Sequence, residues 1–500
     1  MISQEKSNRD LLFILFAAIV LFMQQSWVPG FHPDGYIYAG LSANTIKGNW
    51  LVPHFSTYNY DTFHMHPPFM FMLNGLFFSI IPKSWEAARF VGSIWSILAI
   101  LILFKWIKSE KGRQLAFWVA IFYIINPHVM KLTRSPNLDI FLAFEMTCAF
   151  GFYWFAYTRG KLWHWLAVGA VFGATMMTKG PPAASIPAGI FLHLFLTKSF
   201  SKLKCYKPWL GFIFGLFVFS LWPLSLELSG NYQIFKDYLY HQVYVTVGRG
   251  RERQDFALWT YPWHMLKVSP HIFIFFIIGI IKLPWKKAKD HPLEFIFVSW
   301  FLAVMIPYSF VRWKFSHYII PLYPAYAFIA AYGIYSLKDS FKQKAELTVR
   351  TLIPLVAVVL LCFPVTTNLR RDLPLIHTLD HLSGMQVQPE KVVLMSGSYG
   401  FLNLINLTGW IGTKQIPEQR DISYLDNIPK NTHAIFMHER YWNEMSESKK
   451  LTLKKRFLNL WYYPKFKLYL LLDKSLTELN QNSLFRINRF GPRSLLQNHN

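Results

Sequence analysis

The sequence is poor in the charged residues that cover soluble proteins. Only 16% of its 500 residues are charged, whereas 53% are hydrophobic; a soluble domain usually has about 25% charged residues. Its three cysteines exclude a scaffold built on disulfides. The high apolar content excludes a disordered chain. The chain is therefore neither an ordinary soluble enzyme nor an unstructured segment.

Acidic residues are also scarce, with 27 Asp and Glu against 51 Lys and Arg, a net charge of +24. Such an excess can indicate nucleic-acid binding. Here the basic residues stand between long apolar runs, which is the pattern of membrane topology, so we expect no nucleic-acid partner. The chain also lacks a P-loop, a Rossmann fingerprint and an HExxH motif. Nothing in it indicates ATP- or NAD-driven chemistry.

Apolar runs long enough to cross a bilayer recur through residues 1–367. They predict a polytopic α-helical membrane protein with about eleven (11–13) transmembrane helices. We interpret the first run as an uncleaved helix, because no small-residue cleavage site follows it. The predicted helices lie at 11–29, 88–107, 115–130, 137–157, 162–178, 182–197, 208–228, 268–283, 293–310, 315–336 and 350–367.

A further apolar run, at 67–81, holds only about 15 residues, which suits an interfacial or re-entrant helix. If it does not cross, the short Lys-rich loops at 105–113, 158–161, 197–207, 282–290 and 336–344 share one side. The positive-inside rule makes that side cytoplasmic, together with the N-terminus. The loops at 30–87, 131–136 and 229–267 are then external.

Residues 368–500 lack any long apolar run. Short β-rich stretches at 391–397, 433–437 and 466–472 alternate with polar helical ones, which predicts a small α/β domain. An odd number of crossings places this domain outside. We expect an integral membrane protein with an external C-terminal domain.

Two external loops each place a carboxylate at the start of a helix. Asp34 follows the first predicted helix, and Asp139 begins the fourth. A carboxylate at the membrane boundary is often functional. Asp is also a good helix N-cap, so capping is the plain alternative for both residues; the two roles are compatible.

Basic and histidine residues also collect in the predicted external loops, where topology does not require positive charge. An anionic group such as a lipid phosphate would explain them; ordinary contact with phospholipid headgroups is the alternative. His64 and His66 lie on one side of an extended segment and would allow a divalent cation, although interfacial hydrogen bonding explains them as well. The candidates for phosphate contact are His66, Lys179, Arg249, Arg251, Arg312 and Lys314.

Six stretches together resemble the GT-C glycosyltransferases, and more narrowly glycosyltransferase family 39, the protein O-mannosyltransferase group, with the related lipid A aminoarabinose transferases. They cover about residues 10–340, and the TKGP and KxxHYxxPxYPA strings are the most specific. The stretches are PDGYIYAGLS (33–42), HPPFMFMLNGLF (66–77), EAARFVGSIWSIL (86–98), SPNLDIFLAF (135–144), MTKGPPA (177–183) and WKFSHYIIPLYPAYAF (313–328).

The resemblance implies a GT-C fold and transfer of a sugar from a polyprenyl-phosphate donor to a lipid or protein acceptor. It also implies a place in the bacterial inner membrane, with the C-terminal domain in the periplasm. Asp34 would be the general base of an inverting displacement, and Asp139 would position the acceptor or orient the cations. Two departures stand out, since Gly35 follows Asp34 where the family often has a second acid, and His66 replaces a common Lys. The candidates for positioning donor or acceptor are Tyr36, Tyr38, His317 and Tyr318.

Two other classes of membrane protein remain open. A transporter or flippase of an anionic lipid would carry ionisable residues in mid-helix, and Glu145 is one of few such residues here. An O-antigen ligase or polymerase would concentrate function in a late external loop, whereas the informative residues here fall in the first two. We therefore expect a glycosyltransferase that is in contact with membrane lipids.

Overall fold

The computed structural model describes residues 2–24, 26, 30–31, 33–45, 50–53, 63–249, 255, 257–362, 392–395, 418–420, 422–463 and 468–475. The chain forms two compact units. The first contains Met1–Ser26, Gly48–Pro53 and Thr62–Pro364, and the second contains Trp27–Lys47, His54–Asp61 and Val365–Asn500.

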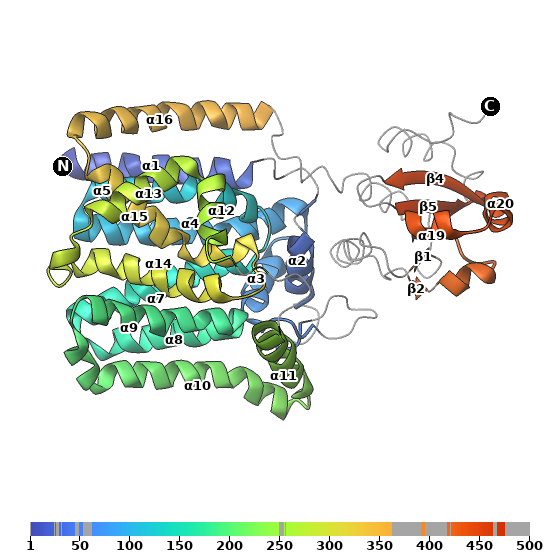
Figure 1. Ribbon diagram of the computed structural model, residues 1–500, viewed down its shortest axis with the longest axis horizontal. Helices are drawn as coiled ribbons and strands as arrows, with labels where there is room; N and C mark the ends of the chain where they lie inside the picture. The colour runs from blue at the N-terminus through green and yellow to red at the C-terminus, as the bar shows by residue number, and fades with distance from the viewer. Residues whose placement is uncertain are drawn as a thin grey trace. The chain divides into compact units, whose positions relative to one another are not determined.

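The first unit is a bundle of helices that run side by side (Figure 1). Its first half contains α1 (Ile2–Met23), α3 (Phe69–Ile80), α4 (Trp85–Lys111), α5 (Arg113–Ile124), α6 (Pro127–Leu132), α7 (Leu138–Arg159), α8 (Leu162–Lys179), η1 (Pro181–Ala184), α9 (Ser185–Leu196), η2 (Phe200–Lys204) and α10 (Tyr206–Leu228). Its second half contains α11 (Gln233–Tyr238), η3 (Leu239–Arg249), α12 (Thr260–Val268), α13 (Pro270–Lys282), η4 (Trp285–Lys287), α14 (Pro292–Phe310), η5 (Ser316–Leu322), α15 (Tyr323–Tyr335) and α16 (Asp339–Cys362).

Helical structure occurs at each of the eleven predicted membrane segments. Among the described residues, five helices are long and apolar enough to cross a membrane by length and composition. The helical membrane architecture is therefore confirmed, while the number of crossings stays a prediction. The short run at 67–81 contains only α3, twelve residues long.

Close backbone contact holds α8 against α10. A Cβ atom added at Gly169 would lie 1.9 Å from the Gly211 carbonyl oxygen, and one at Gly173 would lie 2.4 Å from that of Gly215. Only glycine permits this approach, which is a common way for membrane helices to pack without a hydrophobic driving force. The sequence thus fixes the spacing of these two helices through four small residues.

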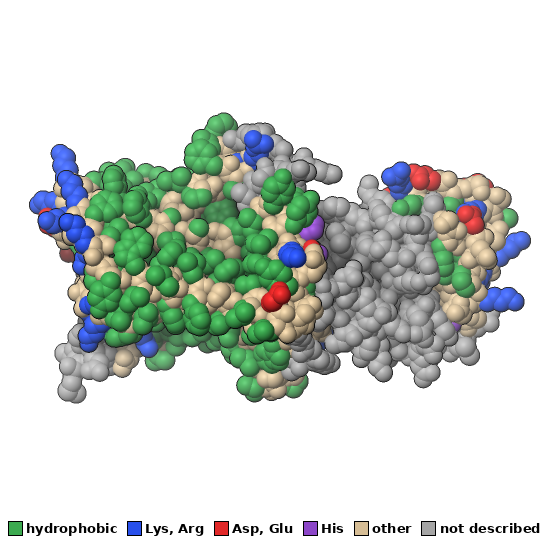
Figure 2. Space-filling model, turned by 90° about the horizontal axis from the view of Figure 1, so that it is seen from below, with side chains coloured by type: hydrophobic (Ala, Val, Ile, Leu, Met, Phe, Trp, Pro, Cys, Tyr) green, Lys and Arg blue, Asp and Glu red, His purple; other side chains and the backbone are tan. Residues whose placement is uncertain are grey.

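Hydrophobic side chains cover the flank of the bundle, and Lys and Arg gather at one end of it (Figure 2). We call this end the basic-loop end. It contains the Lys-rich loops at 105–113, 158–161, 197–207, 282–290 and 336–344. A buried carboxylate ties three helices together there. Asp10 of α1 is 1% exposed and pairs with Arg113 of α5, Nη1 to Oδ2 2.6 Å, and with Arg350 of α16.

The second unit contains α2 (Pro33–Thr45) and a five-stranded sheet of order β2-β1-β3-β5-β4. Strand β1 runs parallel to β2 and β3, and β5 runs antiparallel to β3 and β4. Three of the strands fall in the segments where the sequence predicts them. The remaining elements are β1 (Val392–Met395), β2 (Glu418–Arg420), η7 (Ile422–Asp426), β3 (Ala434–His438), α19 (Glu439–Glu444), α20 (Glu447–Arg456), β4 (Phe457–Tyr463) and β5 (Leu468–Asp473).

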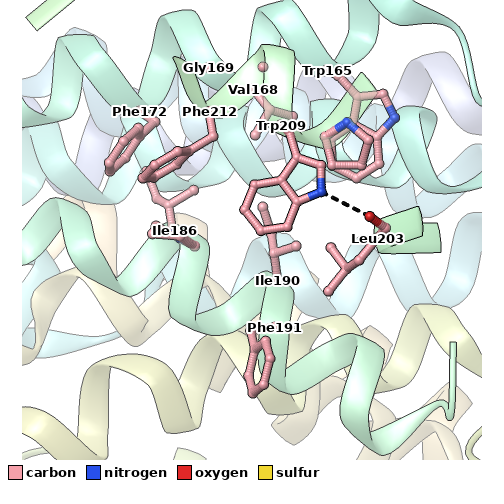
Figure 3. Close-up of a pocket in the computed structure, with 13 residues that line it drawn as sticks. Trp165, Val168, Gly169, Phe172, Ile186, Ile190, Phe191, Leu203, Trp209 and Phe212 are labelled. Carbon is pink, nitrogen blue, oxygen red and sulfur yellow. Dashed lines mark hydrogen bonds between the residues drawn. The ribbon is translucent and has the colours of Figure 1, made fainter. Parts of the chain in front are cut away.

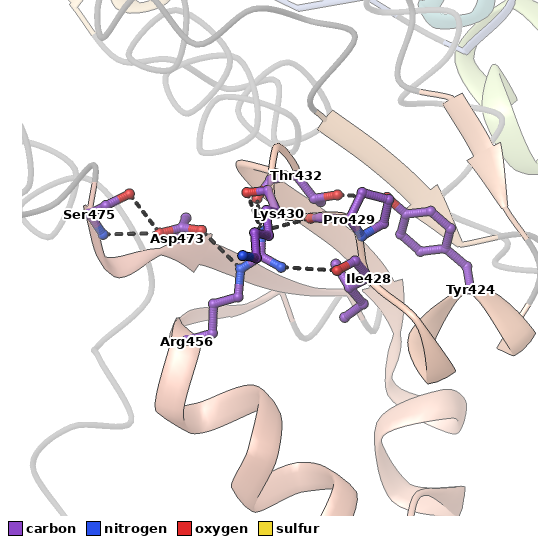
Figure 4. Close-up of polar contacts among 8 residues, drawn as sticks. All are labelled: Tyr424, Ile428, Pro429, Lys430, Thr432, Arg456, Asp473 and Ser475. Carbon is purple, nitrogen blue, oxygen red and sulfur yellow. Dashed lines mark hydrogen bonds and ion pairs between the residues drawn. The ribbon is translucent and has the colours of Figure 1, made fainter.

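One arginine organises the loop before β3 (Figure 4). The Arg456 guanidinium, at the end of α20, pairs with Asp473, Nε to Oδ2 3.1 Å. It also donates to the backbone carbonyls of residues 428, 429, 430 and 432, at 2.8–3.2 Å. Carbonyls and a carboxylate therefore satisfy this side chain, which holds the loop against the sheet.

Candidate functional site

Asp139 does not cap α7, contrary to the capping alternative. The cap is Asn137, whose side-chain oxygen accepts from the backbone N–H groups of Asp139 and Ile140, at 2.9 and 3.1 Å. Asp139 lies in the first turn of the helix and is 3% exposed. Because Asn137 satisfies the helix end, the Asp139 carboxylate is available to other side chains.

That carboxylate binds Lys179, the last residue of α8. The distance from Nζ to Oδ1 is 2.5 Å. The next residue, Gly180, has a φ of 64°, and a Cβ atom there would lie 1.8 Å from the Tyr238 hydroxyl oxygen. Glycine is therefore required at this turn, and the MTKGPPA motif is what presents Lys179 to Asp139.

Aromatic side chains of η5 complete the surroundings of the pair. His317 Nε2 lies 3.9 Å from Asp139 Oδ2, and Lys179 Nζ lies 5.0 Å from the centre of the Tyr318 ring. The Tyr318 and Tyr308 rings are 5.6 Å apart. Asp139, Lys179, His317 and Tyr318, all predicted as site residues, therefore meet in one place.

An apolar groove begins at this cluster. It has a volume of about 290 Å³, and Lys179, Tyr308 and Tyr318 stand among its lining residues. The remaining walls come from η1, α9, α14 and η3, and most are hydrocarbon. They are Pro181, Pro182, Ala184, Ser185, Ala188, Gln242, Ala303, Pro307 and Val311. The arrangement places a cation beside a hydrophobic channel.

Lys314 and the backbone of Arg312 contact the loop before α12. Lys314 donates to the backbone carbonyl of Asp255 at 2.5 Å, and the Asp255 N–H donates to the Arg312 carbonyl at 2.7 Å. The Thr260 hydroxyl and the Ala257 amide, with Lys314 nearby, hold the pKa of the Asp255 carboxyl below its usual value. Asp255, which the sequence did not single out, thus ties the loop before α12 to the 312–314 segment.

The rings near His64 and His66 in the described residues are those of His241 and Phe63. The His64 ring lies 5.0 Å from that of His241, and the His66 ring 6.0 Å from that of Phe63. In the part of the chain that the structure describes, no group of three or more His, Cys, Asp or Glu side chains is placed to hold a metal ion. A divalent cation stays a prediction.

Several predicted residues stand elsewhere. Asp34 lies in the first turn of α2 rather than before it, and Asp34, Tyr36 and Tyr38 belong to the second unit. Arg249 is the last residue of η3. Arg251 lies outside the described residues.

Glu145 is a second buried carboxylate of α7, six residues after Asp139. It is 3% exposed, and its Oε1 accepts from the Thr178 hydroxyl at 2.9 Å. Thr178 immediately precedes Lys179, so α7 binds the last turn of α8 through two carboxylates. Glu145 therefore stabilises the turn that presents Lys179, which is a structural use for a mid-helix acid.

A known protein family matches part of the chain. The model of the dolichyl-phosphate-mannose-protein mannosyltransferase family matches residues 65–222. An undecaprenyl phosphate-alpha-4-amino-4-deoxy-L-arabinose arabinosyl transferase of Proteus mirabilis is 26% identical over 351 residues, which are 68% of this chain and 62% of that protein. The resemblance that the motifs indicate is therefore confirmed.

Two solved structures share the fold. ArnT from Cupriavidus metallidurans bound to undecaprenyl phosphate superposes with a TM-score of 0.65 at 15% identity, covering 92% of this chain and 97% of that one. The archaeal oligosaccharyltransferase AglB from Archaeoglobus fulgidus, in complex with an inhibitory peptide and a dolichol-phosphate, gives a TM-score of 0.54 at 12% identity, with coverages of 93% and 74%. This chain therefore has the GT-C fold that the sequence predicts.

Proposed function

We propose that this protein is a glycosyltransferase that moves a sugar from a polyprenyl-phosphate donor to a lipid or protein acceptor, in the inner membrane of a bacterium. The observation that carries this proposal is the Asp139–Lys179 pair at the mouth of the apolar groove. The similarity to the Proteus transferase, whose name includes undecaprenyl phosphate, supports the same donor class.

The groove and the cation match the two parts of such a donor. The prenyl tail needs a channel of hydrocarbon, and the phosphate needs donors that carry positive charge. An ammonium group has three N–H donors, and one of those of Lys179 points to Asp139. The buried carboxylate holds the Lys179 ammonium group in position, which is the cation-orienting role proposed for Asp139.

The proposed reaction is an inverting displacement. An acceptor hydroxyl oxygen attacks C1 of the sugar, the bond from C1 to the donor phosphate oxygen breaks, and polyprenyl phosphate leaves as an anion. Lys179 stabilises the charge that develops on this leaving group, so no general acid is required. Asp34 takes the proton of the acceptor hydroxyl.

Mass spectrometry of envelope lipids and glycoproteins tests this function, in cells that lack the gene and express either the wild type or Asp34→Asn. We expect the wild type to restore a mass equal to one sugar on a lipid or protein, and Asp34→Asn to restore roughly 10²- to 10⁴-fold less, as for loss of a general base. Asp61→Asn, in the same predicted loop, is the matched control and should behave as wild type.

Two results would count against the proposal. Full activity of Asp34→Asn would show that another group is the base. An unchanged set of sugars, together with accumulation of a lipid-linked precursor in cells without the protein, would favour a transporter instead.

A further inference from the structure

A second apolar groove lies toward the basic-loop end, between α8, α9 and α10 (Figure 3). Its volume is also about 290 Å³, and hydrophobic side chains such as Trp165, Phe172 and Ile190 line it. Trp165 and Lys179 are fourteen residues apart on α8, which corresponds to about 21 Å along the helix axis. None of its lining residues belongs to the groove at Lys179.

The local sequence builds this groove and keeps its mouth in place. Gly169 and Gly211 line it where α8 and α10 are in close contact. The side walls of the groove come from larger residues, such as Trp165 and Phe212. At the mouth, the Trp209 indole N–H donates to the Leu203 carbonyl at 2.9 Å (Figure 3). Trp209 is 55% exposed and Phe191 is 57% exposed, so the groove is open toward the lipid-facing flank.

The two loops that adjoin the groove carry basic residues and no acidic residue. Leu203, which lines the groove, stands between Lys202 and Lys204. In the part of the chain that the structure describes, none of the cations of the two adjoining loops, 158–161 and 197–207, is in an ion pair. These loops contain Arg159, Lys161, Lys198, Lys202, Lys204 and Lys207, and neither Asp nor Glu.

Two of these lysines are fixed by the end of α7. Lys202 donates to the Tyr157 carbonyl and Lys207 to the Gly160 carbonyl, each at 2.7 Å. Their ammonium groups satisfy carbonyls at a helix C-terminus, where positive charge is stabilising. Lys198 and Lys204 are exposed, and these two can turn toward an anion.

We propose that this groove binds one acyl chain of an anionic phospholipid, with Lys198 and Lys204 contacting its phosphate. A hydrocarbon channel suits an apolar chain, and two exposed lysines beside it suit an anion, so an anionic lipid matches both features. Basic pockets between membrane helices commonly bind such headgroups. This site is separate from the proposed donor site, so it is independent of the proposed function.

Native mass spectrometry of the purified full chain tests this proposal, with added phosphatidylglycerol or phosphatidylcholine of the same acyl composition. We expect phosphatidylglycerol to be retained in clear preference. The double variant Lys198→Gln/Lys204→Gln should lower that retention about thirtyfold, since each of the two lysines near an anionic lipid contributes about 1 kcal/mol. Ile190→Trp, which fills the groove, should lower retention of both lipids.

The matched control is Lys286→Gln/Lys287→Gln, which removes two exposed charges from another loop of the basic-loop end, away from the groove. It should retain phosphatidylglycerol as the wild type does. Equal retention of the two lipids, or an equal loss in the control, would overturn the proposal. Displacement of the phospholipid by undecaprenyl phosphate would also overturn it, because the occupant would then be a prenyl phosphate.

Discussion

The two ends of the helical bundle use buried carboxylates and cations for opposite purposes. At the basic-loop end, both oxygens of Asp10 are bound, one by Arg113 and the other by Arg350, and Glu346 pairs with both arginines. At the other end, Asp139 has Lys179 on one oxygen, while His317 stands 3.9 Å from the second. Asp10 therefore has a close arginine on each oxygen, whereas Asp139 has a close cation on only one.

The difference shows that a buried ion pair does not by itself indicate a functional site. The Asp10 network joins α1, α5 and α16, and none of its residues lines either of the two apolar grooves. The Asp139 pair has the same chemistry but stands at the mouth of an apolar groove. We therefore expect substitutions at the first end to lower stability and substitutions at the second end to lower activity.

The largest expected effect is that of Lys179→Met on sugar transfer. Removing one cation that stabilises a developing negative charge should lower the rate roughly 10²- to 10³-fold. Lys179→Arg, which keeps the charge, should retain more activity than Lys179→Met. The measurement is the amount of modified envelope product per folded protein in cells that lack the native gene. Near-normal transfer by Lys179→Met would show that Lys179 is not needed for sugar transfer.

Asp10→Asn should have the reverse profile. It leaves two arginines without their shared buried carboxylate, which should lower the free energy of unfolding by about 3 kcal/mol. Thermal unfolding in detergent, followed by tryptophan fluorescence, measures this change. Glu110→Gln, an exposed acid at the same end, is the control and should not shift the midpoint. If the folded Asp10→Asn protein could no longer transfer sugar, Asp10 would have a role in activity as well as in stability, and the contrast between the two ends would be wrong.

Arg456→Gln extends the comparison to the second unit, where Arg456 is also bound by a carboxylate, that of Asp473. The substitution leaves the carbonyls around the 428–432 loop without their donor, so we expect a local loss of about 1–3 kcal/mol. Hydrogen exchange of residues 428–438 should accelerate, while α20 up to Leu453 should change little. Unchanged protection of this loop would show that Arg456 is not what holds it.

The smallest effect is expected for Glu145→Gln. A glutamine oxygen can still accept the Thr178 hydroxyl, so the turn that carries Lys179 should survive and transfer should stay within about threefold of wild type. Glu145→Leu removes the acceptor and should lower transfer further. If Glu145→Gln abolished transfer at normal stability, the charge of Glu145 would itself take part in function, as in a transporter.

The helices and the meeting of Asp139 with Lys179 and His317 follow from local patterns. Apolar runs predict the helices, and the motif residues stand where helices end, so antiparallel packing brings them together. The Asp10–Arg350 contact joins residues 340 positions apart, and no periodicity relates them. The choice of Asn137 over Asp139 as the cap was also beyond prediction, because both residue types cap well and stand two positions apart.

Binding of undecaprenyl phosphate to the purified full chain tests the central claim most directly, with the wild type, Lys179→Met and Asp10→Asn compared in the same detergent. The account predicts that Lys179→Met weakens binding at least about tenfold, as expected for loss of a charged contact of about 1.5–3 kcal/mol, and that Asp10→Asn binds as the wild type does. Equal binding by Lys179→Met and the wild type would contradict it.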